Sequence, residues 1–134
     1  MINLFIRTKP RPQQRHRNNG RFHYDPSAKE KKEFINQIKE RIPKKPLGMY
    51  IDMCFVFCYK RPKSHFRRKN KKDILKNDVP YYKKNVPDID NLCKFYMDAL
   101  QGYIYKSDSQ VVSINAEKVY GEEDFVHIKI THTK

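Results

Sequence analysis

The pattern of apolar and polar residues predicts a β-strand along four stretches of the chain, three by alternation and one by an apolar run. The stretches are residues 3–8, 48–60, 110–120 and 124–131. Residues 48–60 are apolar on both faces, which is typical of a strand in the middle of a sheet or at a subunit interface. A short connection, Gly121-Glu122-Glu123, separates the last two strands and predicts a hairpin. The side chains of these two strands expected to face the core are Val112, Ile114, Ala116, Val126, Ile128 and Ile130.

Two further stretches repeat apolar residues at helical spacing. The first begins after Asp25-Pro26-Ser27, which favours a helix start, and continues to Ile42. The second covers about residues 90–101. The resulting order of strand, helix, strand, helix, strand, strand predicts an α/β (α+β) fold with a mixed four-stranded sheet. We expect two helices on one face of this sheet, and a single domain over residues 1–134.

Two segments without sustained periodicity carry much of the positive charge. They are a basic loop at about residues 9–24 and a basic insertion at about residues 61–86. The whole chain has 29 Lys and Arg against 15 Asp and Glu, a formal net charge of +14, so nucleic acid is the expected partner. The candidate DNA-binding residues are Arg15, Arg17, Arg21, Arg67, Arg68, Lys69, Lys71, Lys72, Lys83 and Lys84.

No run of about 18 apolar residues suggests a membrane span, and the first residues do not resemble a signal peptide. We therefore expect a cytoplasmic protein with no membrane contact. The three cysteines include no Cys-x-x-Cys pair, and the five histidines are scattered. Buried free thiols are thus a better interpretation than a zinc site.

Acidic residues gather at regular spacing between Pro87 and Val112, next to a basic segment. Inside one helix Asp88 and Asp90 would point about 200° apart, because each residue advances by about 100°. Pro87 favours an extended entry, so Asp88 can precede or cap the helix while Asp90 opens its first turn. The two carboxylates can then share a site.

Asp108 must return along the helix to join this site. A helix over residues 90–101 is about 16 to 18 Å long, and the six residues 102–107 can span about 20 Å. The return is barely feasible within one chain, so a site completed by a second subunit remains open. Each aspartate alone could also be a helix cap, or belong to an exposed ladder of Asp90, Lys94 and Asp98.

Three short motifs carry a family resemblance. Residues 88–94 read Asp-Ile-Asp-Asn-Leu-Cys-Lys, residues 98–100 read Asp-Ala-Leu, and residues 108–111 read Asp-Ser-Gln-Val. These motifs resemble the RusA-type Holliday junction resolvases, which are crossover junction endodeoxyribonucleases. The order of predicted elements agrees over most of the remaining chain. Many members of that family carry a second acid where Ser107 stands here, and the loop before Asp108 is a residue shorter than in some of them.

The resemblance implies that Asp88, Asp90 and Asp108 are metal-binding catalytic carboxylates and that Lys94 is an essential lysine. Asn91 would support the site by hydrogen bonding. Mg²⁺ is the implied cofactor, with Mn²⁺ as a chemical alternative, because both take oxygen ligands.

The implied activity is the resolution of four-way DNA junctions by paired symmetric nicks. Two matched incisions imply a homodimer that binds branched DNA, and such an enzyme suits a bacterium, phage or prophage. The alternative is a non-catalytic basic nucleic-acid-binding module. That alternative explains the charge and the exposed tyrosines equally well. It gives no reason for the spacing of the three aspartates.

Overall fold

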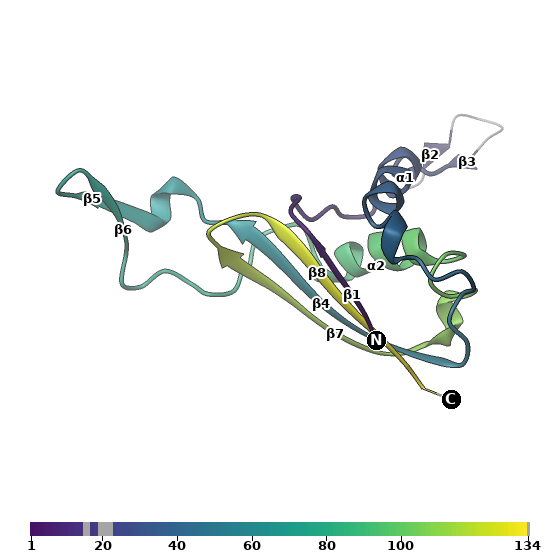
Figure 1. Cartoon of the computed structure of the whole chain (residues 1–134). Helices are drawn as coiled ribbons and strands as arrows, with labels where there is room; N and C mark the ends of the chain where they lie inside the picture. Colours follow the sequence, from purple (N-terminus) through teal and green to yellow (C-terminus); the bar gives the residue numbers. More distant parts are fainter. Residues whose placement is uncertain (15–16, 19–22, 134) are drawn as a thin grey trace.

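A four-stranded sheet with the order β1-β8-β4-β7 forms the centre of the molecule. The computed structural model describes residues 1–14, 17–18 and 23–133. The strands of the sheet are β1 (Ile2–Ile6), β4 (Tyr50–Lys60), β7 (Val111–Gly121) and β8 (Phe125–Thr133). The helices are α1 (Ala28–Gln37) and α2 (Ile89–Leu100), and both lie on the same side of the sheet (Figure 1). The predicted α+β fold is confirmed.

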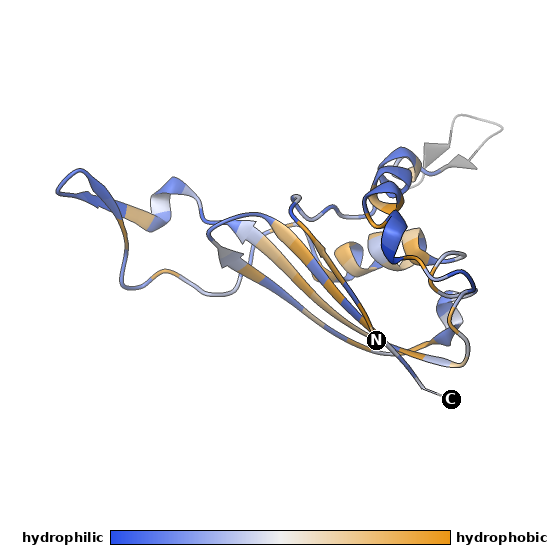
Figure 2. Cartoon of the chain, viewed as in Figure 1, coloured by the Kyte–Doolittle hydropathy of each residue, from blue (hydrophilic) through white to orange (hydrophobic). Residues whose placement is uncertain are grey.

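The core lies between the sheet and the two helices. Every second residue of β4 from Ile51 to Tyr59 is buried, and so are Val126, Ile128 and Ile130 of β8. These side chains pack against Phe34 and Ile35 of α1 and against α2. Figure 2 shows the matching concentration of apolar residues along the strands and on the inner sides of the helices. The buried residues of α2 are Leu92, Cys93, Phe95, Tyr96, Ala99 and Leu100.

The hairpin predicted at residues 121–123 is wrong, because β7 and β8 do not pair with each other. β4 lies between them, parallel to β7 and antiparallel to β8. The connection instead passes the end of β4, where the Arg61 amide donates to the Gly121 carbonyl (3.1 Å). The Lys60 amide also donates to the Asp124 carboxylate (2.8 Å). In this central position β4 is hydrogen-bonded to a neighbouring strand along each of its two edges. A central position is typical of a strand that is apolar on both faces.

This strand order leaves β7 at the edge of the sheet. Val112 and Ile114 were expected in the core, but they are 62% and 46% exposed. Ile51 of β4 pairs with Val111 of β7, but the next residue, Asp52, pairs with Ser113. Val112 therefore lies at a register shift and has no partner residue in β4. Val126, Ile128 and Ile130 of β8 were also expected in the core, and all three are buried there.

Residues 61–86, which we call the arm, connect β4 to α2. The sequence predicts a loop or partly ordered basic insertion here, and the structure shows that it contains a hairpin of β5 (Phe66–Lys69) and β6 (Lys72–Leu75). Asn70 and Lys71 form its two-residue turn with φ values of +53° and +62°, as in the mirror-image turns that suit hairpins. The hairpin projects away from the sheet and is largely hydrophilic (Figures 1 and 2).

The remaining elements are short. β2 (Arg17–Asn18) pairs with β3 (His23–Tyr24), and 3₁₀ turns occur at Lys39–Arg41, Lys63–His65 and Asp108–Gln110. The predicted DNA contacts Arg15 and Arg21 lie outside the described residues. Among the helices that the structure describes, none is long and apolar enough to cross a membrane.

Candidate active site

The start of α2 places Asp88 and Asp90 in different conformations, as the sequence predicts. Asp88 is the N-cap residue with an extended backbone (φ −72°, ψ 145°), and its side chain makes no capping hydrogen bond. Asp90 lies in the first turn, where its Oδ1 accepts from the Asn91 amide (2.9 Å). The preceding loop is fixed by Lys118 of β7, whose Nζ donates to the carbonyls of Asn85 (2.9 Å) and Pro87 (2.8 Å).

A compact turn brings Asp108 back beside α2 within one chain. Gly102 adopts a left-handed φ of +89°, a conformation that glycine reaches without strain. Tyr105 is fully buried and its hydroxyl donates to the Met97 carbonyl (2.6 Å). The Asp108 amide donates to the Gln101 side-chain oxygen (3.1 Å). The end of α2 and the returning segment are therefore joined directly.

Gln110 holds the turn that carries Asp108. Its Oε1 accepts from the amides of Lys106 (3.0 Å) and Ser107 (3.1 Å). Its Nε2 donates to two carbonyls of the segment before β4, those of Leu47 and Met49 (3.1 Å each). The Gln in the Asp-x-Gln-Val motif thus serves to position the backbone.

Asp90, Lys94 and Asp108 line one open pocket of about 480 Å³, which we call the carboxylate pocket. Asp98 also lines it, and its remaining walls are apolar, including the exposed Ile114 of β7. Asp88, the third predicted ligand, is exposed and is not among the residues that line this pocket, although its neighbour Ile89 is.

The exposed ladder that the sequence allowed along α2 does not form. Among the described residues Lys94 makes no ion pair with Asp90 or Asp98. Asp98 instead approaches Lys31 of α1 (3.7 Å). The Lys94 ammonium is therefore available at the pocket.

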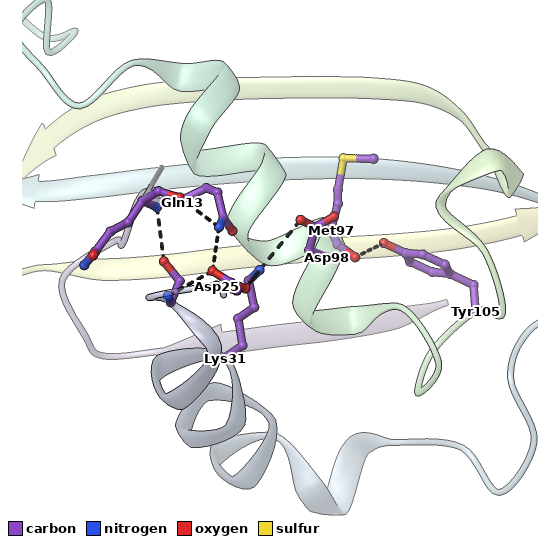
Figure 3. A network of polar contacts seen from close by, with 8 residues as sticks. Gln13, Asp25, Lys31, Met97, Asp98 and Tyr105 are labelled. Carbon is purple, nitrogen blue, oxygen red and sulfur yellow. Dashed lines mark hydrogen bonds and ion pairs between the residues drawn. The ribbon is translucent and has the colours of Figure 1, made fainter. Parts of the chain in front are cut away.

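A polar network ties α2 to α1 and to the N-terminal segment (Figure 3). Lys31 forms an ion pair with Asp25 (2.6 Å), which also accepts from the Gln13 side chain (2.9 Å). The Gln13 amide donates to the Asn91 carbonyl (3.0 Å). Burial opposes ionisation of Asp25, but its hydrogen bonds to Lys31, Ser27 and Gln13 outweigh burial and lower its pKa.

Asn91, predicted to support the site, takes part through its backbone, and its side chain is exposed. Cys93 lies in the same pocket wall, and burial together with the nearby Asp90 carboxylate raises the pKa of its thiol to about 11. Cys93 is therefore neutral at ordinary pH. The charged ligands that the pocket offers a metal are carboxylate oxygens.

The described residues contain no group of three histidine, cysteine, aspartate or glutamate side chains that could hold a metal ion. Two of the predicted ligands, Asp90 and Asp108, do line the same pocket. That donor set suits Mg²⁺, which commonly binds one or two carboxylates and keeps several waters or phosphate oxygens.

The predicted DNA contacts fall into separate regions. Five of them are exposed on the hairpin: Arg67, Arg68, Lys69, Lys71 and Lys72. Lys84 is exposed at the base of the arm, whereas Lys83 is half-buried there. Only the backbone of Arg17 is described, in β2.

The sequence analysis missed the residues that surround Lys83. Lys83 lies over the rings of Tyr59 (5.1 Å) and Tyr120 (5.6 Å), with Lys9 and Arg61 in the same pocket lining. These residues come from different strands and connections. No local pattern in the sequence brings them together.

The family model for Endodeoxyribonuclease RusA matches residues 5–131 of the chain. The chain belongs to the RusA endodeoxyribonuclease family. A similar curated protein is the uncharacterized protein YqaN of Bacillus subtilis (strain 168), which is 33% identical over 117 residues. The aligned region covers 84% of this chain and 80% of YqaN.

Membership of the RusA family decides between the two functional alternatives. The chain is an endodeoxyribonuclease of the Holliday junction resolvase class, and branched DNA is its partner. RusA-family nucleases are metal-dependent. The non-catalytic binding module is thereby set aside.

Proposed function

We propose that this protein resolves four-way DNA junctions by paired symmetric nicks that require Mg²⁺. The observation that carries the proposal is the grouping of Asp90, Lys94 and Asp108 around one pocket in a member of an endodeoxyribonuclease family. None of the three side chains forms an ion pair among the described residues. Their charges are therefore free to act on substrate and metal.

In this proposal Asp90 and Asp108 are the first two metal ligands, and Asp88 is the third. Asp88 suits this role because it directly precedes Ile89 of the pocket lining and its exposed carboxylate is not used as a helix cap. Bound Mg²⁺ supplies an activated water and stabilises charge on the phosphate. Lys94 steadies the negative charge that develops on the scissile phosphate.

The proposal includes a homodimer, because two matched incisions need two equivalent sites related by symmetry. The apolar, exposed edge of β7 beside the carboxylate pocket supports an interface close to each site, since Val112 and Ile114 are left in solvent in the single chain. Asn91 supports the site through the hydrogen bond between its carbonyl and the Gln13 amide.

The test compares cleavage of a labelled synthetic four-way junction with cleavage of a linear duplex of the same sequence, in Mg²⁺ or in EDTA. The wild-type protein should nick two opposed strands of the junction only in Mg²⁺. Asp90→Asn should lower the cleavage rate by at least about 100-fold and retain junction binding.

Glu40→Gln is the matched control, since it removes one exposed carboxylate from the turn that follows α1. This variant should cut at the wild-type rate. Cleavage that persists in EDTA, or that survives in Asp90→Asn, would reject the proposed metal site. Equal cutting of the linear duplex would reject the junction as the specific substrate.

A further inference from the structure

A second open pocket, of about 530 Å³, lies where the arm leaves the sheet. We call it the basic pocket, because five cations line it: Lys9, Lys60, Arg61, Lys63 and Lys83. Asp124 is the one carboxylate in the described lining, and it accepts the hydrogen bond from the Lys60 amide (2.8 Å). The pocket therefore concentrates positive charge.

Lys83 lies over two aromatic rings in this pocket. Its Nζ lies 5.1 Å from the ring centroid of Tyr59 and 5.6 Å from that of Tyr120, and Arg61 lies 5.6 Å from the same Tyr120 ring. Among the described residues no carboxylate pairs with Lys83. Burial, followed by repulsion from Lys118 and Lys9, lowers the pKa of Lys83. An anion bound here would remove that repulsion.

The loop before α2 places the basic pocket next to the candidate active site. Asn85, Val86 and Pro87 line the basic pocket, whereas Ile89 and Asp90 line the carboxylate pocket. Asp88 is the single residue of the chain that separates these two sets of lining residues. Lys118 fixes this arrangement through its hydrogen bonds to the carbonyls of Asn85 and Pro87.

The other side of the basic pocket is the root of the arm. Arg61 and Lys63 begin the arm, and Lys83 lies near its end. The Lys83 amide donates to the Lys118 carbonyl (2.9 Å), which pins the returning chain along β7. A strand of DNA that runs from the cationic hairpin to the carboxylate pocket must pass this root.

We propose that the basic pocket binds one backbone phosphate of the DNA strand that is cut, next to the scissile phosphate, with Lys83 as its main donor. Lysine binds phosphate as a point charge. The two tyrosine rings hold the Lys83 ammonium in place, so little side-chain entropy remains to be lost on binding. The proposal rests on the proposed function, because it assumes that the cut strand lies in the carboxylate pocket.

The test neutralises single phosphates of the junction, one position at a time, by methylphosphonate substitution. Binding is measured by fluorescence anisotropy without Mg²⁺ and with EDTA, so that no strand is cut. For the wild-type protein one position close to the cut should weaken binding by about 10-fold. In Lys83→Gln the same substitution should cause no further loss, and the salt slope of binding should fall by about 0.9.

Lys45→Gln is the matched control, since Lys45 is an exposed lysine in the segment before β4, outside the pocket. The affinity of this variant for the junction should still fall by about 10-fold when the sensitive phosphate is neutralised. Lys83→Arg should recover part of the binding, and thermal unfolding of each variant shows whether the fold is intact. A wild-type protein with no sensitive position, or a sensitive position that Lys83→Gln leaves unchanged, would overturn the proposal.

Competition with inorganic phosphate and with a mononucleotide separates a DNA backbone phosphate from a free one. Each competitor should displace the junction only at millimolar or higher concentration. Displacement of the junction by a micromolar mononucleotide would overturn the proposal in favour of a nucleotide site. Binding is measured here without cleavage. A protein that cuts no junction but loses its phosphate sensitivity in Lys83→Gln would therefore contradict the proposed nuclease function and still support the phosphate site.

Discussion

Asp88 occupies the N-cap position of α2, yet its carboxylate accepts no hydrogen bond from the helix. A capping aspartate usually contributes about 1 kcal/mol to the stability of a helix. That contribution is absent here, so the carboxylate of Asp88 is not engaged by the helix. The position of Asp88 before the helix follows from Pro87 and from helical geometry, and it could be predicted from the sequence alone.

Lys118 should act as a positioning residue for Asp88, since its ammonium holds the carbonyls of Asn85 and Pro87. Lys118→Met should lower the single-turnover cleavage rate by about 10- to 100-fold, because small displacements of a reacting group are costly. The dissociation constant for the junction should change much less. Single-turnover cleavage and anisotropy measure the two quantities.

Lys129→Met serves as the control for that experiment, because Lys129 is an exposed lysine of β8 whose side chain makes no hydrogen bond to the described part of the chain. It should cleave at the wild-type rate. A Lys118→Met protein that loses affinity but cuts bound junction at the normal rate would show that Lys118 acts on DNA binding instead.

Asp25 makes stability depend on pH in the acidic range. Its hydrogen bonds lower its pKa in the folded protein below the unfolded value of about 3.9. The unfolded state therefore binds more protons, and the free energy of unfolding is fully maintained above about pH 4 and falls as the pH drops through the folded pKa. Asp25→Asn should flatten this part of the curve, measured by urea unfolding between pH 2 and 5. An unchanged slope would contradict the role of the Lys31 and Gln13 contacts.

At the scale of elements, the central position of β4 determines the rest of the fold. Its two apolar faces predicted a central strand, and both helices and all four strands of the sheet could be located from periodicity. Their order could not be predicted, because the short connection at 121–123 favours a hairpin locally. Pairing of β4 with both β7 and β8 overrides this signal. The exposure of Val112 and Ile114 follows from that order.

Gly121, at the end of β7, should tolerate even the smallest added side chain poorly. A Cβ atom at Gly121 would lie 2.6 Å from the buried Sγ of Cys58. Gly121→Ala should therefore lower the free energy of unfolding by about 1–3 kcal/mol. Urea unfolding measures the loss. In a double-mutant cycle, Cys58→Ala should relieve most of it, and simple additivity of the two losses would contradict the proposed clash.

At the scale of the whole molecule, the chain carries a net charge of +14, yet three aspartates line the carboxylate pocket. The motifs single out Asp88, Asp90 and Asp108 as the acids of the site, and that role stays a prediction. The structure shows that Asp108 can return to the pocket of Asp90 within one chain, a point that the sequence left open. Lys83 was among the predicted DNA contacts, but its grouping with the other residues of the basic pocket could not be predicted. Tyr59 and Tyr120 become neighbours only because β4 and β7 pair in a particular register.

A mixing experiment tests how the proposed dimer builds its sites. Asp90 and Asp108 of one chain line the same pocket, so both acids of a site should come from the same subunit. A heterodimer of Asp90→Asn with Asp108→Asn should therefore be inactive at both sites. Co-expression with two affinity tags isolates the heterodimer, and junction cleavage is then measured.

The control for the mixing experiment pairs a wild-type subunit with Asp90→Asn. This heterodimer should nick one strand of the junction and leave the opposed strand intact. Recovery of cleavage in the doubly substituted heterodimer would contradict the prediction, because it requires a site that shares acids between subunits.

Both ends of the arm are attached to the same short stretch of β7. The Arg61 amide bonds to the Gly121 carbonyl, and the Lys83 amide bonds to the Lys118 carbonyl. Between these anchors, the hairpin of β5 and β6 pairs only with itself in the part of the chain that the structure describes, so its length can change without altering the pairing of the central sheet. During evolution, the reach of such an enzyme along its substrate can thus diversify while its chemistry stays constant. For an engineer, the ends of this hairpin mark where a foreign recognition module can be spliced into the chain.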